Sequence, residues 1–117
     1  MEPSTDLQSF KADFFKALAH PIRIRILELL RSRDRSVQEL QALLDLDQST
    51  VSQQLAVLRA KSIVTARKEG TTVRYAMRDA LVADLLDVAR RIFNNQLTGT
   101  QTMLRQLRQE ARRPARR

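Results

Sequence analysis

The 117-residue sequence contains no cysteine, one histidine, two glycines and only 4% aromatic residues. Without cysteine the chain has no disulfide, no thiolate metal site and no cysteine nucleophile. It also has no glycine-rich phosphate loop, and one histidine allows no Ser-His-Asp grouping beyond chance, so the sequence gives an enzyme little support. No stretch approaches the roughly 18 unbroken apolar residues of a membrane span, and the start of the chain lacks a signal pattern. We therefore expect a cytoplasmic protein without catalytic activity.

One folded domain fits a chain of this length, of which 43% is hydrophobic. The scarcity of glycine and aromatic residues favours helices. Lysine and arginine outnumber aspartate and glutamate, which gives a formal net charge of +8. Such an excess indicates a polyanionic partner, and charge alone does not distinguish nucleic acid from an anionic membrane surface.

The stretch 36–61 has the pattern of two short helices joined by a turn. Ser36 and Glu39 form the S-x-x-E pattern of a capping box, in which each side chain bonds the backbone amide of the other residue. Asp47 can cap the second helix after a polar break. This order predicts a helix-turn-helix.

The second helix of this pair separates an apolar face from a small, polar and uncharged one. Its inward residues recur at i, i+4 and i+7 and are Val51, Leu55 and Leu58. The opposite face contains Gln48, Ser49, Ser52, Gln53 and Ala56. Side chains of this kind can hydrogen-bond to base edges in a DNA major groove, although an ordinary amphipathic helix of a bundle has the same pattern.

Residues 63–77 alternate with a period of 2, which predicts the two strands of a β-hairpin. Gly70 can supply the positive φ that a tight turn needs. Arg67, Lys68 and Arg74 crowd the hairpin tip, where they are well placed to contact DNA phosphates. A hairpin tip that uses its charge only to blunt the sheet edges is the alternative.

Two helices are predicted ahead of the helix-turn-helix, after a loose polar leader of residues 1–5. The apolar side of the first helix contains Leu7, Phe10, Phe14 and Leu18. Phe15 lies off that stripe, where we expect it to face a partner. His20 and Pro21 separate the two helices, and we expect a structural role for His20. The second helix is apolar over most of its surface and is the expected core helix, with arginines at its rim.

A last long helix is predicted after Asp79, with apolar residues in a seam close to a heptad. The seam is wider than a small core needs, so we expect it to pack against a second copy of the chain, beside the first helix. The residues expected at this dimer interface are Phe10, Phe14, Phe15, Leu85, Ala89, Ile92 and Phe93.

The end of the chain is strongly basic. From Arg105 onward it contains six arginines and one glutamate, so these residues account for +5 of the total +8. A tail of this kind is usually disordered and strengthens non-specific binding to DNA. We therefore predict a DNA-binding and dimerisation domain over residues 1–104 and a basic tail over residues 105–117.

The predicted order, mainly α with a small β-hairpin, is that of a winged helix-turn-helix. Three blocks resemble the ArsR/SmtB family of bacterial transcription regulators: FKALAHPIRIRIL at 15–27, LDQSTVSQQLAVLR at 46–59, and RKEG at 67–70 followed by VRY at 73–75. The resemblance covers residues 10–95. It implies a homodimer paired through its first and last helices, which binds an inverted repeat in promoter DNA and is usually released by an effector.

The resemblance also assigns DNA contacts by position. The recognition face would comprise Gln48, Ser49, Thr50, Ser52, Gln53 and Gln54, and the wing would contribute Arg67, Lys68 and Arg74. The family's frequent Arg-His pair in the recognition helix is replaced here by Gln53-Gln54, which should alter base preference. Ser62 stands where a glycine often precedes the hairpin.

The metal ligands that many family members use are missing. Metal sensors often have cysteines at the start of the helix-turn-helix, where this chain has SVQE at 36–39, or Asp and His on the last helix, which here contains no histidine. We therefore predict no cofactor and no usual zinc or copper site. Weak metal binding by Asp84 and Asp87 stays open, as do a small-molecule effector and a sensor partner protein.

The leading prediction is a sequence-specific DNA-binding transcriptional regulator. Two other functions stay open at this point. A winged-helix module that docks a protein would dimerise without discriminating between DNA sequences. An architectural DNA binder driven by the arginine tail would show steep salt dependence and little sequence preference.

Overall fold

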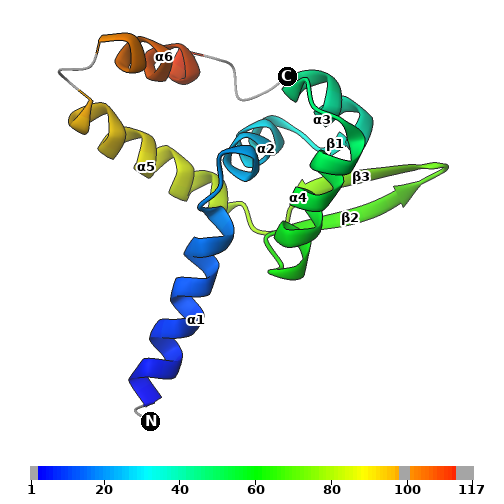
Figure 1. The fold of residues 1–117 in the computed structure, drawn as a ribbon, viewed down its shortest axis with the longest axis horizontal. Coiled ribbons are helices and arrows are strands. Elements are labelled where there is room, and N and C mark those ends of the chain that lie inside the picture. The colour runs from blue at the N-terminus through cyan, green and yellow to red at the C-terminus, as the bar shows by residue number, and fades with distance from the viewer. Residues whose placement is uncertain (1–2, 98–100, 113–117) are drawn as a thin grey trace.

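The computed structural model describes residues 3–97 and 101–112, which form six helices and a three-stranded sheet (Figure 1). The helices are α1 (Pro3–Leu18), α2 (Pro21–Ser32), α3 (Val37–Leu44), α4 (Gln48–Ala60), α5 (Leu81–Gln96) and α6 (Gln101–Arg112). The strands are β1 (Arg35–Ser36), β2 (Val64–Glu69) and β3 (Thr72–Met77). The order confirms the predicted winged helix-turn-helix and adds β1 and α6.

The core lies where α2 packs against α3, α4, β3 and α5. Ile26 and Leu27 from α2, with Leu40 from α3 and Leu55 from α4, are fully buried. Each such side chain stabilises the fold by about 1.5–3 kcal/mol relative to an exposed position. The prediction that the apolar second helix is central is therefore confirmed.

Local hydrogen bonds define the helix-turn-helix as the sequence predicted. The Ser36 Oγ accepts from the Glu39 amide at 3.1 Å, and the Ser36 amide donates to the Glu39 carboxylate at 2.9 Å. Asp45 adopts a left-handed conformation, with φ of 57°, and ends α3. The Asp47 carboxylate then accepts from the Thr50 amide at 3.3 Å and begins α4.

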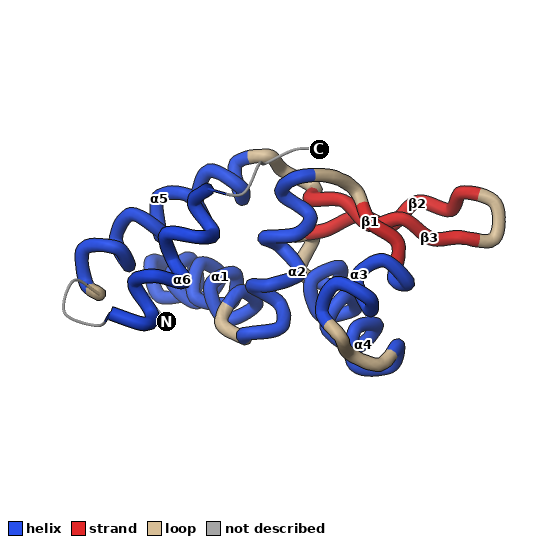
Figure 2. The backbone as a smooth tube through the Cα atoms, turned by 90° about the horizontal axis from the view of Figure 1, so that it is seen from above, coloured by secondary structure: helices blue, strands red, loops and turns tan. Residues whose placement is uncertain are grey.

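The hairpin closes through a two-residue turn, because Glu69 pairs with Thr72 and Gly70 has φ of +66°. β1 pairs with β3, so the short strand before α3 joins the wing to the base of the helix-turn-helix. Figure 2 shows the hairpin projecting from one end of the molecule, with α5 and α6 at the other. Ser62 has φ of 60°, the left-handed region that favours glycine.

One expectation about the ends of the chain is wrong, because α1 already begins at Pro3 and residues 3–5 are therefore not a loose leader. At the other end, α6 continues through Arg112, so residues 105–112 of the basic segment are helical. Leu104 is buried and Leu107 half-buried because their spacing of three residues places both on one side of α6. Residues 1–2 and 113–117 lie outside the described residues, and the division into 1–104 and 105–117 stays a prediction.

Candidate nucleic-acid interface

The outward face of α4 has the polar character that the sequence predicted. Gln48, Ser49 and Gln53 are exposed, whereas Val51 and Leu55 are fully buried on the other side of the helix. The remaining three predicted contacts are partly buried and lie toward the flanks of this face: Thr50, Ser52 and Gln54. The helix therefore presents a narrow polar surface, a shape that can enter a major groove.

Sequence reasoning overlooked the C-terminal end of α4. Arg59 and Lys61 are both exposed there. Val57, which is 37% exposed, and Ala60 continue the outward face beyond Ala56. The helical period could have predicted this extension, because Val57 and Ala60 follow Gln53 and Ala56 at spacings of four residues, and residues three and four apart share a face. These residues add positive charge beside a small apolar surface.

Asp47 determines the electrostatics at the other end of α4. Hydrogen bonds to Thr50 and Ser49 hold the pKa of the Asp47 carboxyl below its usual range. The Ser49 hydroxyl donates to this carboxylate at 3.1 Å. The resulting negative charge complements the helix dipole but opposes a phosphate at the same place. We infer that the first turn of α4 is suited to base edges and not to the DNA backbone.

The wing residues Arg67 and Lys68 are exposed on β2. Arg67 bonds to the Asp34 carboxylate at 3.4 Å and to the Glu69 carboxylate at 3.3 Å. Exposed ion pairs of this kind are weak, so a phosphate can replace these carboxylates at little cost. The positions of both residues fit the predicted backbone contacts.

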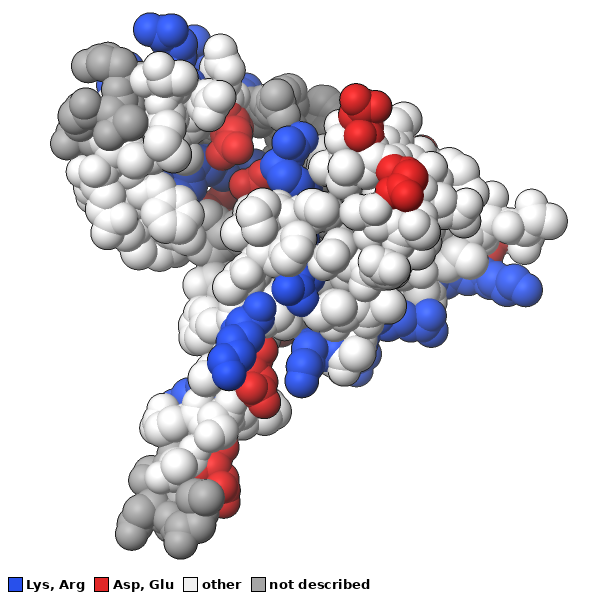
Figure 3. Space-filling view, in the orientation of Figure 1, with Lys and Arg blue, Asp and Glu red and all other residues white. Residues whose placement is uncertain are grey.

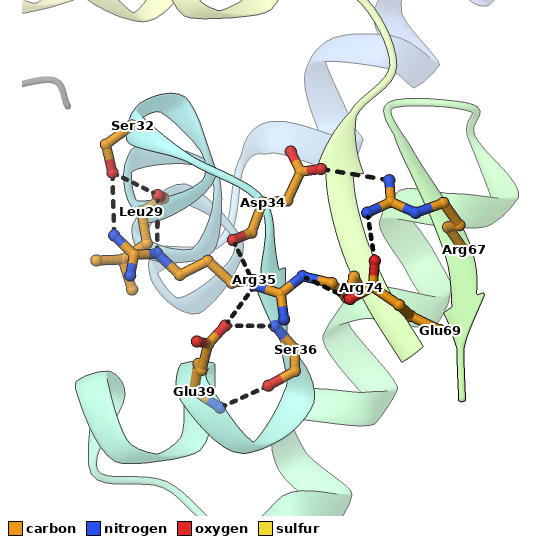
Figure 4. Close-up of polar contacts among 9 residues, drawn as sticks. All are labelled: Leu29, Ser32, Asp34, Arg35, Ser36, Glu39, Arg67, Glu69 and Arg74. Carbon is orange, nitrogen blue, oxygen red and sulfur yellow. Dashed lines mark hydrogen bonds and ion pairs between the residues drawn. The ribbon is translucent and has the colours of Figure 1, made fainter. Parts of the chain in front are cut away.

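Arg74 differs from these two residues, because its guanidinium bonds inside the fold (Figure 4). Its side chain is only 19% exposed. The Nη2 atom donates to the Asp34 carbonyl at 3.3 Å and to the Glu39 carboxylate at 3.2 Å. Arg74 was grouped with the DNA contacts on sequence grounds, whereas here it connects β3 to the capping box of α3.

Carboxylates compensate an unfavourable pairing in the hairpin. Arg67 lies directly opposite Arg74 in the strand register, and like charges at opposed positions repel. Asp34, Glu39 and Glu69 surround the two guanidiniums (Figure 4). The hydrogen bond from the Ser36 amide holds the pKa of Glu39 below its ordinary value; burial opposes this shift, and the nearby arginines, led by Arg74, add to it. This network fixes the wing relative to the helix-turn-helix.

Charge is unevenly distributed over the face shown in Figure 3. Basic side chains line the edge that runs below the hairpin and α4, whereas acidic side chains appear over the region of α3. A basic edge beside a polar helix face is the arrangement expected for phosphate contacts that flank base contacts.

The predicted dimer residues fall into two groups. Four are exposed: Phe10 at 74%, Phe15 at 57%, Ile92 at 49% and Phe93 at 50%. The other three are partly buried: Phe14, Leu85 and Ala89. Phe14 packs on the core and meets Phe15 edge to face, with ring centroids 5.4 Å apart.

Sequence reasoning missed two exposed residues of α5, Leu81 and Val88. With Leu85 and Ile92 they form an apolar stripe at i, i+4, i+7 and i+11, which we call the α5 stripe. α1 projects away from the body of the molecule near the start of α5 (Figure 1). The chain therefore leaves two apolar helix surfaces uncovered.

The single imidazole has a structural role, as expected. The Nδ1 atom of His20 accepts a hydrogen bond from the Ile22 amide at 3.1 Å and caps α2. Asp87 is bonded to Arg31 and Arg90, while Asp84 is exposed. Among the described residues no three His, Cys, Asp or Glu side chains gather as a metal site would require, and no helix is both long and apolar enough to cross a membrane.

A polar recognition helix beside a basic β-hairpin defines a winged helix-turn-helix protein of the DNA-binding class. The family model described as bacterial regulatory protein, arsR family, matches residues 20–66. The HTH-type transcriptional regulator Rv0081 of Mycobacterium tuberculosis is 47% identical over 106 residues, covering 90% of this chain and 93% of its own length. This chain belongs to the ArsR family of transcriptional regulators, and it is not an enzyme.

Further relatives agree in sequence and in fold. The crystal structure of Rv0081 matches with a TM-score of 0.73 at 48% identity, covering 84% of this chain and 96% of that one. A biofilm growth-associated repressor of Agrobacterium fabrum is 40% identical over 82 residues, 70% of each chain. Mb0332 of Mycobacterium bovis, described as a homodimeric winged helix-turn-helix DNA-binding domain, matches with a TM-score of 0.76 at 28% identity, covering 86% and 94%.

Proposed function

We propose that the protein is a homodimeric transcriptional regulator that binds an inverted repeat in promoter DNA and responds to an effector. The observation that carries this proposal is the outward face of α4, where exposed Gln48, Ser49 and Gln53 lie beside a basic wing. In this arrangement α4 enters the major groove and reads bases, while Arg67 and Lys68 contact phosphates.

The uncovered apolar surfaces support the dimer. Phe10 and Phe15 on α1 are exposed, as are Leu81, Val88 and Ile92 of the α5 stripe, and clustered exposed apolar side chains mark association surfaces. Pairing through these helices is consistent with the homodimeric domain described for Mb0332. A twofold dimer presents two copies of α4, and half-sites about 34 Å apart on DNA then form an inverted repeat.

Fluorescence anisotropy on labelled duplexes tests the DNA-binding function. The DNA upstream of the protein's own gene should bind roughly 10³-fold more tightly than a scrambled duplex, and the preference should persist at physiological salt. Equal binding of both duplexes, with release of both as salt rises, would favour the architectural alternative. A chain shortened to residues 1–112 serves as the control for charge at the C-terminal end.

The reading face is tested by the double variant Ser52→Ala/Gln53→Ala. Loss of two base contacts should reduce discrimination by roughly 10- to 100-fold while the dimer stays intact, because neither side chain belongs to the apolar surfaces. Gln109→Ala on α6 is the matched control, since it removes an exposed amide far along the chain from α4. Unchanged discrimination in the double variant would refute the assignment of this face.

A further inference from the structure

A groove of about 880 Å³ lies between the C-terminal end of α2, α5 and α6. Its volume falls within the range of about 300–1,000 Å³ that is typical of small-molecule sites. Figure 3 shows a hollow between the lobe that contains α5 and α6 and the rest of the molecule, with charged side chains inside it. The charged residues that line the groove are Arg31, Asp87, Arg90, Arg91 and Arg108.

Positive charge is only partly compensated in this groove. The Asp87 Oδ1 atom accepts from both Arg31 and Arg90, the latter at 2.6 Å. The side chains of Arg31 and Arg90 are 19% and 22% exposed, so one carboxylate oxygen serves two largely buried guanidiniums. Each guanidinium has five donors, and the Asp87 carboxylate accepts from one nitrogen of each, so both retain donors that a bound anion can use. Arg91 and Arg108 add further positive charge at the rim.

The carboxylates of Glu28 and Glu110 lie near the groove but do not cancel its excess of positive charge. The Glu28 Oε1 atom lies 3.9 Å from the Arg25 Nε atom, and neither residue lines the groove. Burial and the nearby Glu110 raise the pKa of Glu28, while Arg25, Arg90 and Arg31 oppose that shift. The groove therefore stays cationic with its neighbours included.

The groove lies on the side of α5 that the proposed dimer leaves open. At about 100° per residue, Ala83, Asp87, Arg90 and Asn94 share one side of the helix. The α5 stripe lies on the opposite side. A ligand could therefore enter the groove of each subunit without separating the dimer.

We propose that this groove is an effector site for a small organic anion, whose carboxylate or phosphate group is bound by the arginines. Arg91 and Arg108 supply donors from α5 and α6, and Asn94 and Asn95 supply amides beside them. Binding of the anion does not depend on the proposed function, whereas its action as an effector does. α2 contacts both α5 and α4, so an anion held between α2, α5 and α6 acts on the helix that supports the recognition helix.

Isothermal titration calorimetry on the full chain tests the site, with citrate and pyrophosphate as probes and sodium chloride at matched ionic strength as the reference. We expect one saturable site per chain for at least one probe. A preference for citrate identifies a carboxylate ligand, and a preference for pyrophosphate identifies a phosphate ligand. Absence of saturable binding by both would overturn the proposal.

A pair of matched variants distinguishes a built site from general charge. Arg91→Ala/Arg108→Ala should weaken binding at least about tenfold, because charge-assisted hydrogen bonds to the anion are lost. Arg105→Ala/Arg112→Ala removes the same charge from exposed α6 positions outside the groove lining and should change affinity less than about twofold. Equal losses in both variants would overturn the proposal.

Asp87→Asn should change the affinity for the anion in the opposite direction to the arginine substitutions. Removing the internal carboxylate frees Arg31 and Arg90 for the ligand, so affinity for the anion should rise several-fold even as thermal stability falls. A lower stability with unchanged or weaker anion binding would contradict the site. Anisotropy of the same protein on DNA without any anion reports the proposed function separately, so failure of one proposal does not hide the other.

Discussion

Two halves of the molecule differ in how completely they bury their apolar side chains. One half, which we call the reading half, comprises α2, α3, α4 and the sheet, and the other comprises α1 and α5. In the first half, Leu40, Leu55 and Ile63 are almost completely buried, and side chains cap both helices of the helix-turn-helix. In the second half, Phe10 is 74% and Leu81 67% exposed. The difference shows that the first half buries its apolar residues within its own chain, whereas the second half leaves apolar surface exposed, which the proposed dimer would cover.

The largest effect should come from the self-contained half. Leu55→Ala should lower the free energy of unfolding by about 2–5 kcal/mol, because a fully buried side chain leaves a cavity in the core. Val57→Ala on the same helix is the control, and since Val57 is 37% exposed it should cost less than about 1 kcal/mol. Urea unfolding followed by circular dichroism measures both. Similar losses would mean that α4 does not pack as described.

The next largest effect should be on dimerisation and not on the stability of the single chain. Ile92→Glu places a charge in the α5 stripe and should weaken dimerisation by roughly 100-fold with little change in the fold of each chain. Analytical ultracentrifugation over a range of concentrations measures this change. Asn94→Glu, on the groove side of α5, is the matched control and should leave the dimer intact. A dimer that survives Ile92→Glu would remove α5 from the interface.

Within the wing, substitution of Arg74 should mainly lower folding stability, whereas substitution of Arg67 should mainly weaken DNA binding. Arg74→Ala should cost about 1–3 kcal/mol of folding stability, because the Glu39 carboxylate and the Asp34 carbonyl lose a partly buried partner. Arg67→Ala should leave folding stability nearly unchanged, since its side chain is 58% exposed and exposed ion pairs are weak.

For DNA binding the order should be the opposite, with Arg67→Ala having the larger effect and Arg74→Ala the smaller. The salt dependence of log K should become shallower by about 0.9 in Arg67→Ala, the value for one lost phosphate contact, and should stay unchanged in Arg74→Ala. Anisotropy titrations at several salt concentrations measure both slopes. An equal change in Arg74→Ala would return that residue to the DNA contacts.

The smallest effect concerns pH. The pKa of Glu39 is held below its ordinary value of 4.5, so the folded state gains stability from this carboxylate above that value and loses it as pH falls through the lowered pKa. Glu39→Gln keeps an oxygen acceptor for the Ser36 amide without the charge. The stability difference between the two proteins should therefore be greatest near neutral pH and shrink as pH falls through the lowered pKa. A difference that is constant with pH would contradict this account.

The helix-turn-helix and the hairpin could be predicted because their signals are local. Ser36 and Glu39 of the capping box are only three positions apart, and Gly70 with Thr71 forms a complete turn. The role of Arg74 could not be predicted, since its partners Asp34 and Glu39 lie 40 and 35 residues away along the chain. A two-residue strand such as β1 is equally hidden, because only its pairing with β3 defines it.

The structure of the basic end of the chain could not be predicted, for a different reason. Its net charge of +5 suggested a solvated tail, and Leu104 and Leu107 carried the weaker signal of a helix. A short amphipathic helix is marginal in isolation and gains its stability from packing. Its contact with α5 could not be inferred from composition.

The sequence by itself determined where the reading helix begins, which of its faces is polar and where the hairpin turns, because caps, helical period and turn residues act within a few positions. The tertiary structure alone decided that Arg74 bonds the capping box, that α6 and α5 enclose a cationic groove, and which apolar residues stay uncovered. Those outcomes depend on contacts between segments far apart in the chain, which no local pattern specifies.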